Sequence, residues 1–159
     1  MCCLLGCAFA WCLLFHYRVL FFVVPFYVLP LLLKGEHRRL RRLASDRQNE
    51  NICDFVRKFD WRRTDTWVLR AVYEELSRHL AVDRRSLPIR ADDYLWEDGL
   101  GIDSEDLDDL ALAIAARAGR SLDDTRKNPF YGGKVQTIRD LVAFMEHQPR
   151  LALEHRPVV

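Results

Sequence analysis

The residues best suited to carry chemistry lie in one acidic stretch, residues 100–110, where a glycine turn leads into a serine. Ser104 follows Asp103, and both are residue types that commonly cap helix N-termini. A serine hydroxyl at such a position faces solvent beside free backbone N–H groups, where a phosphate ester is electrostatically favoured. Ser104 therefore has two interpretations, as a covalent attachment point or as a plain helix cap.

Acidic side chains dominate the sequence around Ser104. Residues 91–116 contain nine Asp or Glu and no Lys, Arg or His. Four of these acids directly follow the serine: Glu105, Asp106, Asp108 and Asp109. Such a surface attracts a basic partner protein through its long-range field, although an acidic helix face can also be simply solvated.

Several other chemistries are excluded by pattern. Ser104 does not lie in a G-x-S-x-G motif, so it is not expected to be a hydrolase nucleophile. Residues 103–109 do not form a calcium loop, because Leu107 stands at a ligand position. The cysteines lack zinc spacing, and nothing pairs the scattered histidines, His79 among them, with Ser104. We expect no catalytic residue and no metal ligand, and hence no enzyme.

Helical periodicity surrounds the acidic stretch. The first helix is predicted after Asp65 as its N-cap, with an apolar stripe formed by Leu69, Val72, Tyr73, Leu76 and Leu80. The second begins at Asp103 or Ser104 and ends before Gly119. A turn-rich segment follows at residues 128–133, after a very short helix, and Thr137 with Asp140 forms a capping box for the last helix.

The whole pattern predicts an all-α fold. No β-alternation of useful length occurs, and residues 83–93 are interpreted as a long polar connection. We expect a small bundle of three to four helices with a long first loop, preceded by a membrane-associated helix.

This order of elements resembles the acyl carrier proteins over about residues 65–146, with Leu-Gly-x-Asp-Ser at residues 100–104. The resemblance implies that Ser104 carries a 4′-phosphopantetheine arm, that Asp103 is its acidic neighbour, and that Glu105, Asp106, Asp108 and Asp109 face a basic, acyl-processing partner. It implies a carrier that holds acyl groups as thioesters and catalyses nothing itself. Its features are closest to a divergent bacterial branch of the family.

A second interpretation remains open beside the carrier. Glu105 stands where the family usually has an aliphatic residue, and Asp108 where an apolar residue is common. The alternative is an unmodified module of the same fold, whose acidic helix docks a basic partner.

The N-terminal residues 1–33 form the strongest compositional signal, with no acid and a single charge, Arg18. A bilayer core takes about 20 apolar residues as a helix, and we expect one transmembrane or membrane-associated helix within residues 8–33. Five basic residues between Lys34 and Arg42 follow it. They predict an inner-membrane location with the C-terminal domain facing the cytoplasm.

Four segments follow from this division. Residues 1–33 are the hydrophobic membrane segment, and residues 34–63 a basic juxtamembrane linker with a short amphipathic helix at Ile52, Phe55, Val56 and Phe59. Residues 64–148 are the acyl-carrier-like domain, and residues 149–159 a flexible tail. The linker carries ten basic and five acidic residues, and residues 64–159 carry 13 and 18. Because the bundle is acidic, nucleic acid is not an expected partner.

Overall fold

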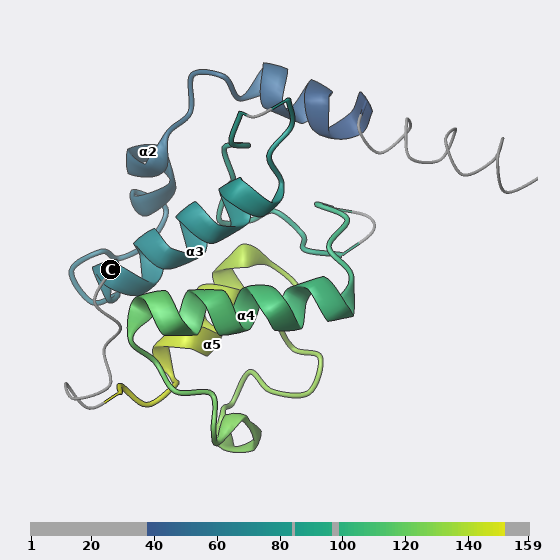
Figure 1. Cartoon of the computed structure of the whole chain (residues 1–159). Coiled ribbons are helices and arrows are strands. Elements are labelled where there is room, and N and C mark those ends of the chain that lie inside the picture. The colour runs from purple at the N-terminus through teal and green to yellow at the C-terminus, as the bar shows by residue number, and fades with distance from the viewer. Residues whose placement is uncertain (1–37, 84, 97–98, 152–159) are drawn as a thin grey trace, which may run out of the picture. The chain divides into compact units, whose positions relative to one another are not determined.

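The computed structural model describes residues 38–83, 85–96 and 99–151, and it is helical. Residues 38–46 are helical, and Arg42–Val159 forms one compact unit. Its further elements are shown in Figure 1: α2 (Ile52–Val56), α3 (Thr66–His79), α4 (Ser104–Ala118), the 3₁₀ helix η1 (Thr125–Lys127) and α5 (Ile138–Glu146). Among the described residues β-structure is limited to isolated bridges. The expected small all-α bundle is confirmed.

The membrane helix expected within residues 1–33 lies outside the described residues. None of the helices that the structure describes combines the length and the apolar character needed to cross a bilayer.

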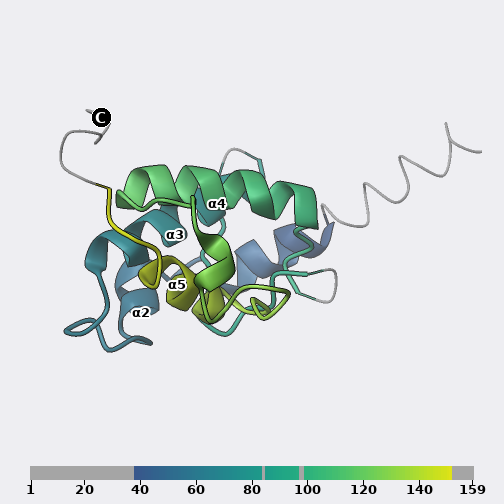
Figure 2. The same cartoon turned by 90° about the horizontal axis from the view of Figure 1, so that it is seen from below.

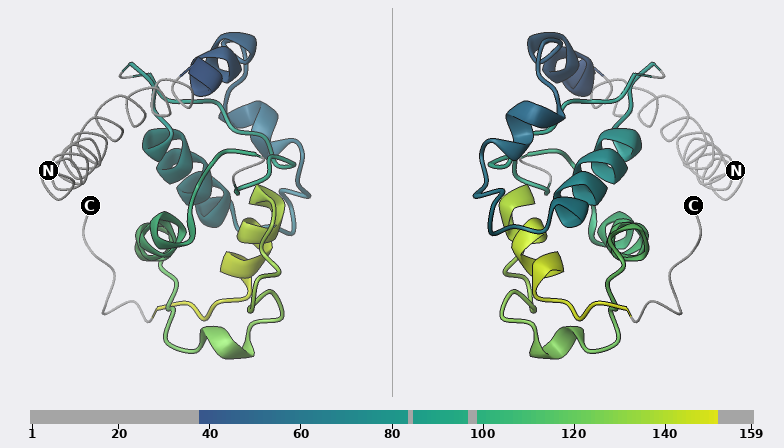
Figure 3. Two further views of the ribbon diagram at one scale, coloured as in Figure 1. Left: turned by 90° about the vertical axis from the view of Figure 1, so that its right-hand side faces the viewer. Right: turned by 90° about the vertical axis from the view of Figure 1, so that its left-hand side faces the viewer.

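Helix α3 is the central element, because it contacts α2, α4 and α5. Figures 2 and 3 show α4 and α5 against different sides of α3, with η1 in the segment that connects them. The stripe expected on α3 is buried at Leu69, Val72 and Leu76. The core therefore forms around α3, as its 3.6-residue periodicity predicts.

The predicted helix ends are confirmed. The Asp65 carboxylate caps α3 by accepting a hydrogen bond from the Trp67 N–H at 3.0 Å. Thr137 and Asp140 form the capping box of α5. Gly119 ends α4 with a φ of 65°, a left-handed conformation that glycine adopts without steric cost.

The connection between α3 and α4 is less polar than the sequence indicates. Leu87, Ile89 and Leu95 in this connection are fully or almost fully buried. Its backbone also pairs with the start of α5, since the Arg139 N–H donates to the Ala91 carbonyl at 2.8 Å and the Leu95 N–H to the Gln136 carbonyl at 3.0 Å. The described residues of this loop are thus part of the core and are hydrogen-bonded to the start of α5.

Arg47, in the segment predicted to be a linker, is bound to the bundle. Its guanidinium nitrogens Nη1 and Nη2 donate to the two carboxylate oxygens of Asp93 at 2.6 and 2.8 Å, and Nη1 also donates to the Pro88 carbonyl at 3.2 Å. Arg47 is 7% exposed. This bidentate pair attaches the residues before α2 to the α3–α4 connection.

A second buried arginine joins the ends of three helices. Arg120, directly after α4, donates from Nη2 to the Asp65 carboxylate at 2.8 Å and from Nη1 to the carbonyls of Glu146 and Gln148 at 3.1 and 2.8 Å. The Asp65 N–H in turn donates to the Glu146 carboxylate at 2.8 Å. The start of α3, the end of α4 and the end of α5 are therefore held by one hydrogen-bonded group.

The ionisation of Asp65 depends on these contacts. Burial alone would raise the pKa of Asp65, but hydrogen bonds from the Trp67 N–H and Arg120, with the nearby charge of Arg150, lower the pKa below its ordinary value of 3.8. A carboxylate whose pKa is lowered by folding stabilises the protein fully above its unfolded-state pKa. That stability is lost as the pH falls through the folded-state pKa.

We expect Asp65→Asn to lower the free energy of unfolding at pH 7 by about 3 kcal/mol, because it leaves the buried Arg120 charge without its partner. The variant should also lose less stability than the wild type when the pH falls below about 4, since it lacks this titrating group. Urea unfolding of the full chain in non-ionic detergent, followed by far-UV circular dichroism, measures both effects. Asp123→Asn, at an exposed carboxylate, is the matched control and should stay within about 0.5 kcal/mol of wild type. A loss at position 65 no larger than in this control would contradict the assignment.

Candidate functional site

A tightly hydrogen-bonded turn positions the residues before Ser104. The Leu100 N–H donates to the Tyr94 carbonyl at 2.7 Å, and the Ile102 N–H donates to the Leu95 carbonyl at 2.8 Å. Leu100 and Ile102 are buried, while Gly101 has a φ of 76°. Because the turn needs this left-handed residue and two buried anchors, the spacing Leu-Gly-x-Asp-Ser fixes where α4 begins.

Asp103, rather than Ser104, is the N-cap of α4. The Asp103 carboxylate accepts a hydrogen bond from the Asp106 N–H at 2.8 Å, and the Asp103 carbonyl accepts one from the Leu107 N–H at 3.0 Å. Ser104 is the first residue of the helix. The cap interpretation therefore holds for Asp103 and does not account for Ser104.

The polar groups of Ser104 remain available. Its side chain is exposed, and no residue in the described part of the chain accepts or donates a hydrogen bond to its hydroxyl. The N–H groups of Ser104 and Glu105 likewise have no acceptor among the described residues. A free hydroxyl thus lies beside two free donors at the positive end of a helix dipole.

The predicted partner-facing acids all lie in the first turns of α4. Glu105, Asp106, Asp108 and Asp109 are exposed. Asp106 has one close basic neighbour, since its carboxylate oxygen lies 3.6 Å from Nε2 of His79 at the end of α3. This neighbour was not predicted from the sequence, because it depends on the packing of the end of α3 against the start of α4.

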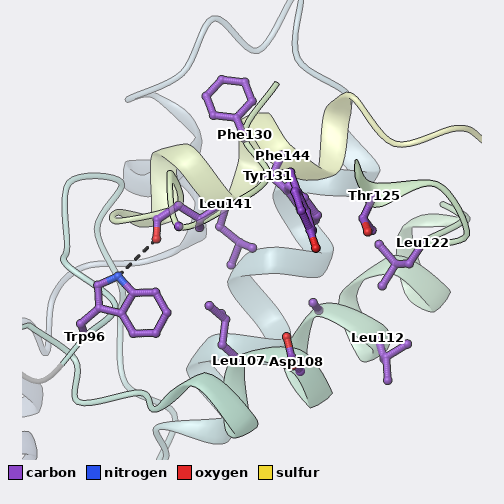
Figure 4. A pocket seen from close by; sticks show the side chains of 14 residues that line it. Trp96, Leu107, Asp108, Leu112, Leu122, Thr125, Phe130, Tyr131, Leu141 and Phe144 are labelled. Carbon is purple, nitrogen blue, oxygen red and sulfur yellow. Dashed lines mark hydrogen bonds between the residues drawn. The ribbon is translucent and has the colours of Figure 1, made fainter. Parts of the chain in front are cut away.

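An apolar pocket of about 410 Å³ lies beside these residues (Figure 4). Leu107, Asp108 and Ala111 of α4 line one side, and Leu141 and Phe144 of α5 line another. The remaining lining residues come from the α3–α4 connection and from the chain between α4 and α5: Trp96, Leu122, Thr125, Phe130, Tyr131, Gly132, Gly133 and Val135, with Leu112 on α4. The Trp96 indole N–H donates to the Val135 carbonyl at 3.2 Å, which satisfies its polar group at the pocket edge.

The sequence did not predict this pocket, although a signal for it was present. Phe130 and Tyr131 are aromatic residues in a glycine-rich turn, directly before Gly132 and Gly133. Both glycines have a φ of 81°, so the chain turns sharply next to Phe130 and Tyr131, which are among the residues that line the pocket. Large aromatic side chains gathered in a surface turn indicate an interaction site or a ligand-binding groove.

In the part of the chain that the structure describes, no group of three or more His, Cys, Asp or Glu side chains could hold a metal ion. Comparison of the chain with family models, curated proteins and solved structures gave no significant match.

We expect the two neighbouring residues of the site to differ in their effect on stability. Asp103→Ala should lower the free energy of unfolding by about 1 kcal/mol, because it removes the N-cap. Ser104→Ala should change it by less than about 0.5 kcal/mol, because no contact is lost. Urea unfolding of the two variants makes the comparison. Equal losses at both positions would show that Ser104 contributes to the cap.

Proposed function

We propose that this chain is a membrane-tethered acyl-carrier-like protein whose Ser104 bears a 4′-phosphopantetheine arm. The observation that carries the proposal is the exposed Ser104 hydroxyl, which no described residue engages, at the first position of α4. The adjacent Asp103 supplies the cap, so esterification of the serine would disturb no contact.

The residues at the start of α4 fit a phosphodiester. The free N–H groups of Ser104 and Glu105 would hold its oxygens, and the helix dipole favours the negative charge by about 0.3–1 kcal/mol. The acids that follow oppose that charge, but they are exposed and screened by salt. The covalent ester, rather than the field, would hold the arm. Its thiol, when present, supplies the thioester linkage to an acyl group.

The pocket beside α4 supports the choice of an apolar cargo. Leu107 and Ala111 follow Ser104 by three and seven residues, so they lie on the same face of α4, the nearer about 4.5 Å along the axis. Apolar side chains dominate the lining. An acyl chain attached through Ser104 would be removed from water there, which is favourable by about 25 cal/mol per Å² of apolar surface.

The acids on α4 would be the docking surface. Glu105, Asp106 and Asp109 are exposed beside the serine, and their field would attract the basic surface of an acyl-processing enzyme. The chemistry would belong to that enzyme. The carrier would deliver its acyl group to that enzyme and then dissociate from it.

The membrane tether is proposed from residues 1–33 and from the basic residues between Lys34 and Arg42. The apolar run is long enough for a span, and the basic run would keep the domain on the cytoplasmic side of the inner membrane. Tethering would raise the effective concentration of the carrier near membrane-bound enzymes.

The second candidate is an unmodified interaction module of the same fold. It is favoured by Glu105, an exposed acid directly after the serine, where an apolar residue would cover an arm better. In that case the acidic face of α4 would bind a basic partner and Ser104 would stay free.

We expect the full chain, co-expressed with a phosphopantetheinyl transferase of broad specificity, to gain the mass of one phosphopantetheine group. Ser104→Ala should abolish the gain, because the hydroxyl is the attachment atom. Ser86→Ala, at another exposed serine, is the control and should be modified like the wild type. Intact-mass spectrometry reads the result. An unmodified wild type, under conditions that modify a known carrier, would contradict the carrier proposal and favour the interaction module.

The tether makes a separate prediction. The full chain should stay in the membrane pellet after an alkaline carbonate wash, because a bilayer-inserted apolar helix is not released by high pH. Removal of residues 1–33 should move the protein into the soluble fraction. A full chain extracted by carbonate would show that the N-terminal segment is not inserted.

A further inference from the structure

The segment from the end of α2 to the first turn of α3 exposes two tryptophans. Trp61 is 53% exposed, and Trp67, in the first turn of α3, is 60% exposed. We name residues 57–67 the basic–aromatic loop, because they hold these two indoles together with Arg57, Lys58, Arg62 and Arg63. All four basic side chains are exposed. Large indoles in solvent beside cations mark an interaction surface.

The positive charge of this loop is only partly cancelled. Arg57 lies 3.2 Å from Asp54 and Arg63 lies 3.4 Å from Asp60, while Asp65 is bound by Arg120 and Arg150 outside the loop. Lys58 and Arg62 have no ion pair among the described residues. The Arg62 guanidinium lies over the Trp61 ring at 5.2 Å from its centroid, so cation and indole are presented together.

The inner side of the basic–aromatic loop packs against α2 and α5. The Phe59 ring lies 5.0 Å from the Phe55 ring, centroid to centroid, and the Arg139 guanidinium lies 5.2 Å from the Phe59 centroid. Arg139 also donates from Nη1 to the Lys58 carbonyl at 3.1 Å. These contacts fix the inner side of the loop, while the tryptophans stay outside the core.

The basic–aromatic loop and Ser104 lie at opposite ends of the bundle. Helices α3 and α4 are antiparallel, because the end of α3 meets the start of α4 at His79 and Asp106 while Asp65 meets Arg120 at the other end. The 15 residues of α4 span about 22 Å. The domain therefore has an acidic end at Ser104 and a basic, indole-bearing end at Trp61 and Trp67.

We propose that the basic–aromatic loop docks on the surface of an anionic lipid bilayer. Indole rings partition to the headgroup level of a bilayer, and basic side chains beside them are attracted by anionic lipids. The same surface potential repels the acidic end, so docking would turn Ser104 and the α4 acids toward the aqueous phase, where a partner can reach them. The proposal rests on the proposed membrane tether, which keeps the loop near lipid.

The test uses the full chain in nanodiscs whose lipids carry brominated acyl chains, which quench nearby tryptophan. The chain has four tryptophans, and Trp61→Phe with Trp67→Phe removes the two in the loop while leaving Trp11 and Trp96. The difference in emission between wild type and this variant reports the loop alone. Adding Trp96→Phe to this variant leaves Trp11 as the one tryptophan of the chain, so the emission of the triple variant reports the tether.

In brominated discs that contain phosphatidylglycerol, we expect the emission of Trp61 and Trp67 to be roughly twofold weaker than in unbrominated discs of the same headgroups. In brominated discs of phosphatidylcholine alone, we expect no quenching of these two residues. Lys58→Glu with Arg62→Glu should restore the emission in anionic discs. The matched change Lys127→Glu with Lys134→Glu, at two exposed lysines outside the loop, should not.

If the emission of Trp61 and Trp67 is not quenched in anionic discs while that of Trp11 is, lipid docking is contradicted and the membrane tether is supported. The basic–aromatic loop would then bind a protein. Quenching of the loop without quenching of Trp11 would support docking and reject the tether. Absence of both would overturn both proposals.

Discussion

The ion pair between the partly buried Asp65 and the buried Arg120 is the constraint on which the arrangement of the helices depends. It joins the cap of α3 to the chain directly after α4, and Arg120 also binds the carbonyls of Glu146 and Gln148 beyond α5. Two charges with this little exposure are held in place by their mutual contact and their hydrogen bonds. The pair thereby sets the antiparallel order of α3 and α4, and with it the two unlike ends of the domain.

Everything proposed for Ser104 follows from where α4 begins. The turn before it is fixed by the buried Leu100 and Ile102, and its cap is supplied by Asp103. The Ser104 hydroxyl therefore makes no hydrogen bond to any described residue. A pocket lined by Leu107 and Ala111 of α4 lies on the same side of the helix as Ser104, so an acyl chain attached at Ser104 as proposed would have an apolar site close by.

Local patterns predicted much of this fold. Asp65 and Thr137 cap helices as expected, because an N-cap depends only on the first turn that follows it, and the structure decides between Asp103 and Ser104 in favour of Asp103. Contacts between distant segments were not predictable in this way. Arg47 falls in the predicted linker and Arg120 just beyond the predicted end of the second helix, yet both are buried against acids that lie 46 and 55 residues away in the sequence.

At the candidate site, too, local features were predictable from the sequence and tertiary contacts were not. The position of Ser104 followed from the motif, but its freedom from contacts, the proximity of His79 to Asp106 and the pocket behind Phe130 and Tyr131 depend on tertiary packing. The sequence around a serine is the same whether its hydroxyl caps the helix or makes no contact, so sequence alone does not separate the two cases. Only the structure assigned the cap to Asp103 alone.

The most direct test is mass spectrometry of the protein as its own cells make it. Trypsin would release residues 91–117 as one peptide, because the preceding residue is Arg90 and no basic residue lies between it and Arg117. We expect this peptide to carry phosphopantetheine, with fragment ions that place it on Ser104. Recovery of the peptide in its unmodified form alone would contradict the carrier function.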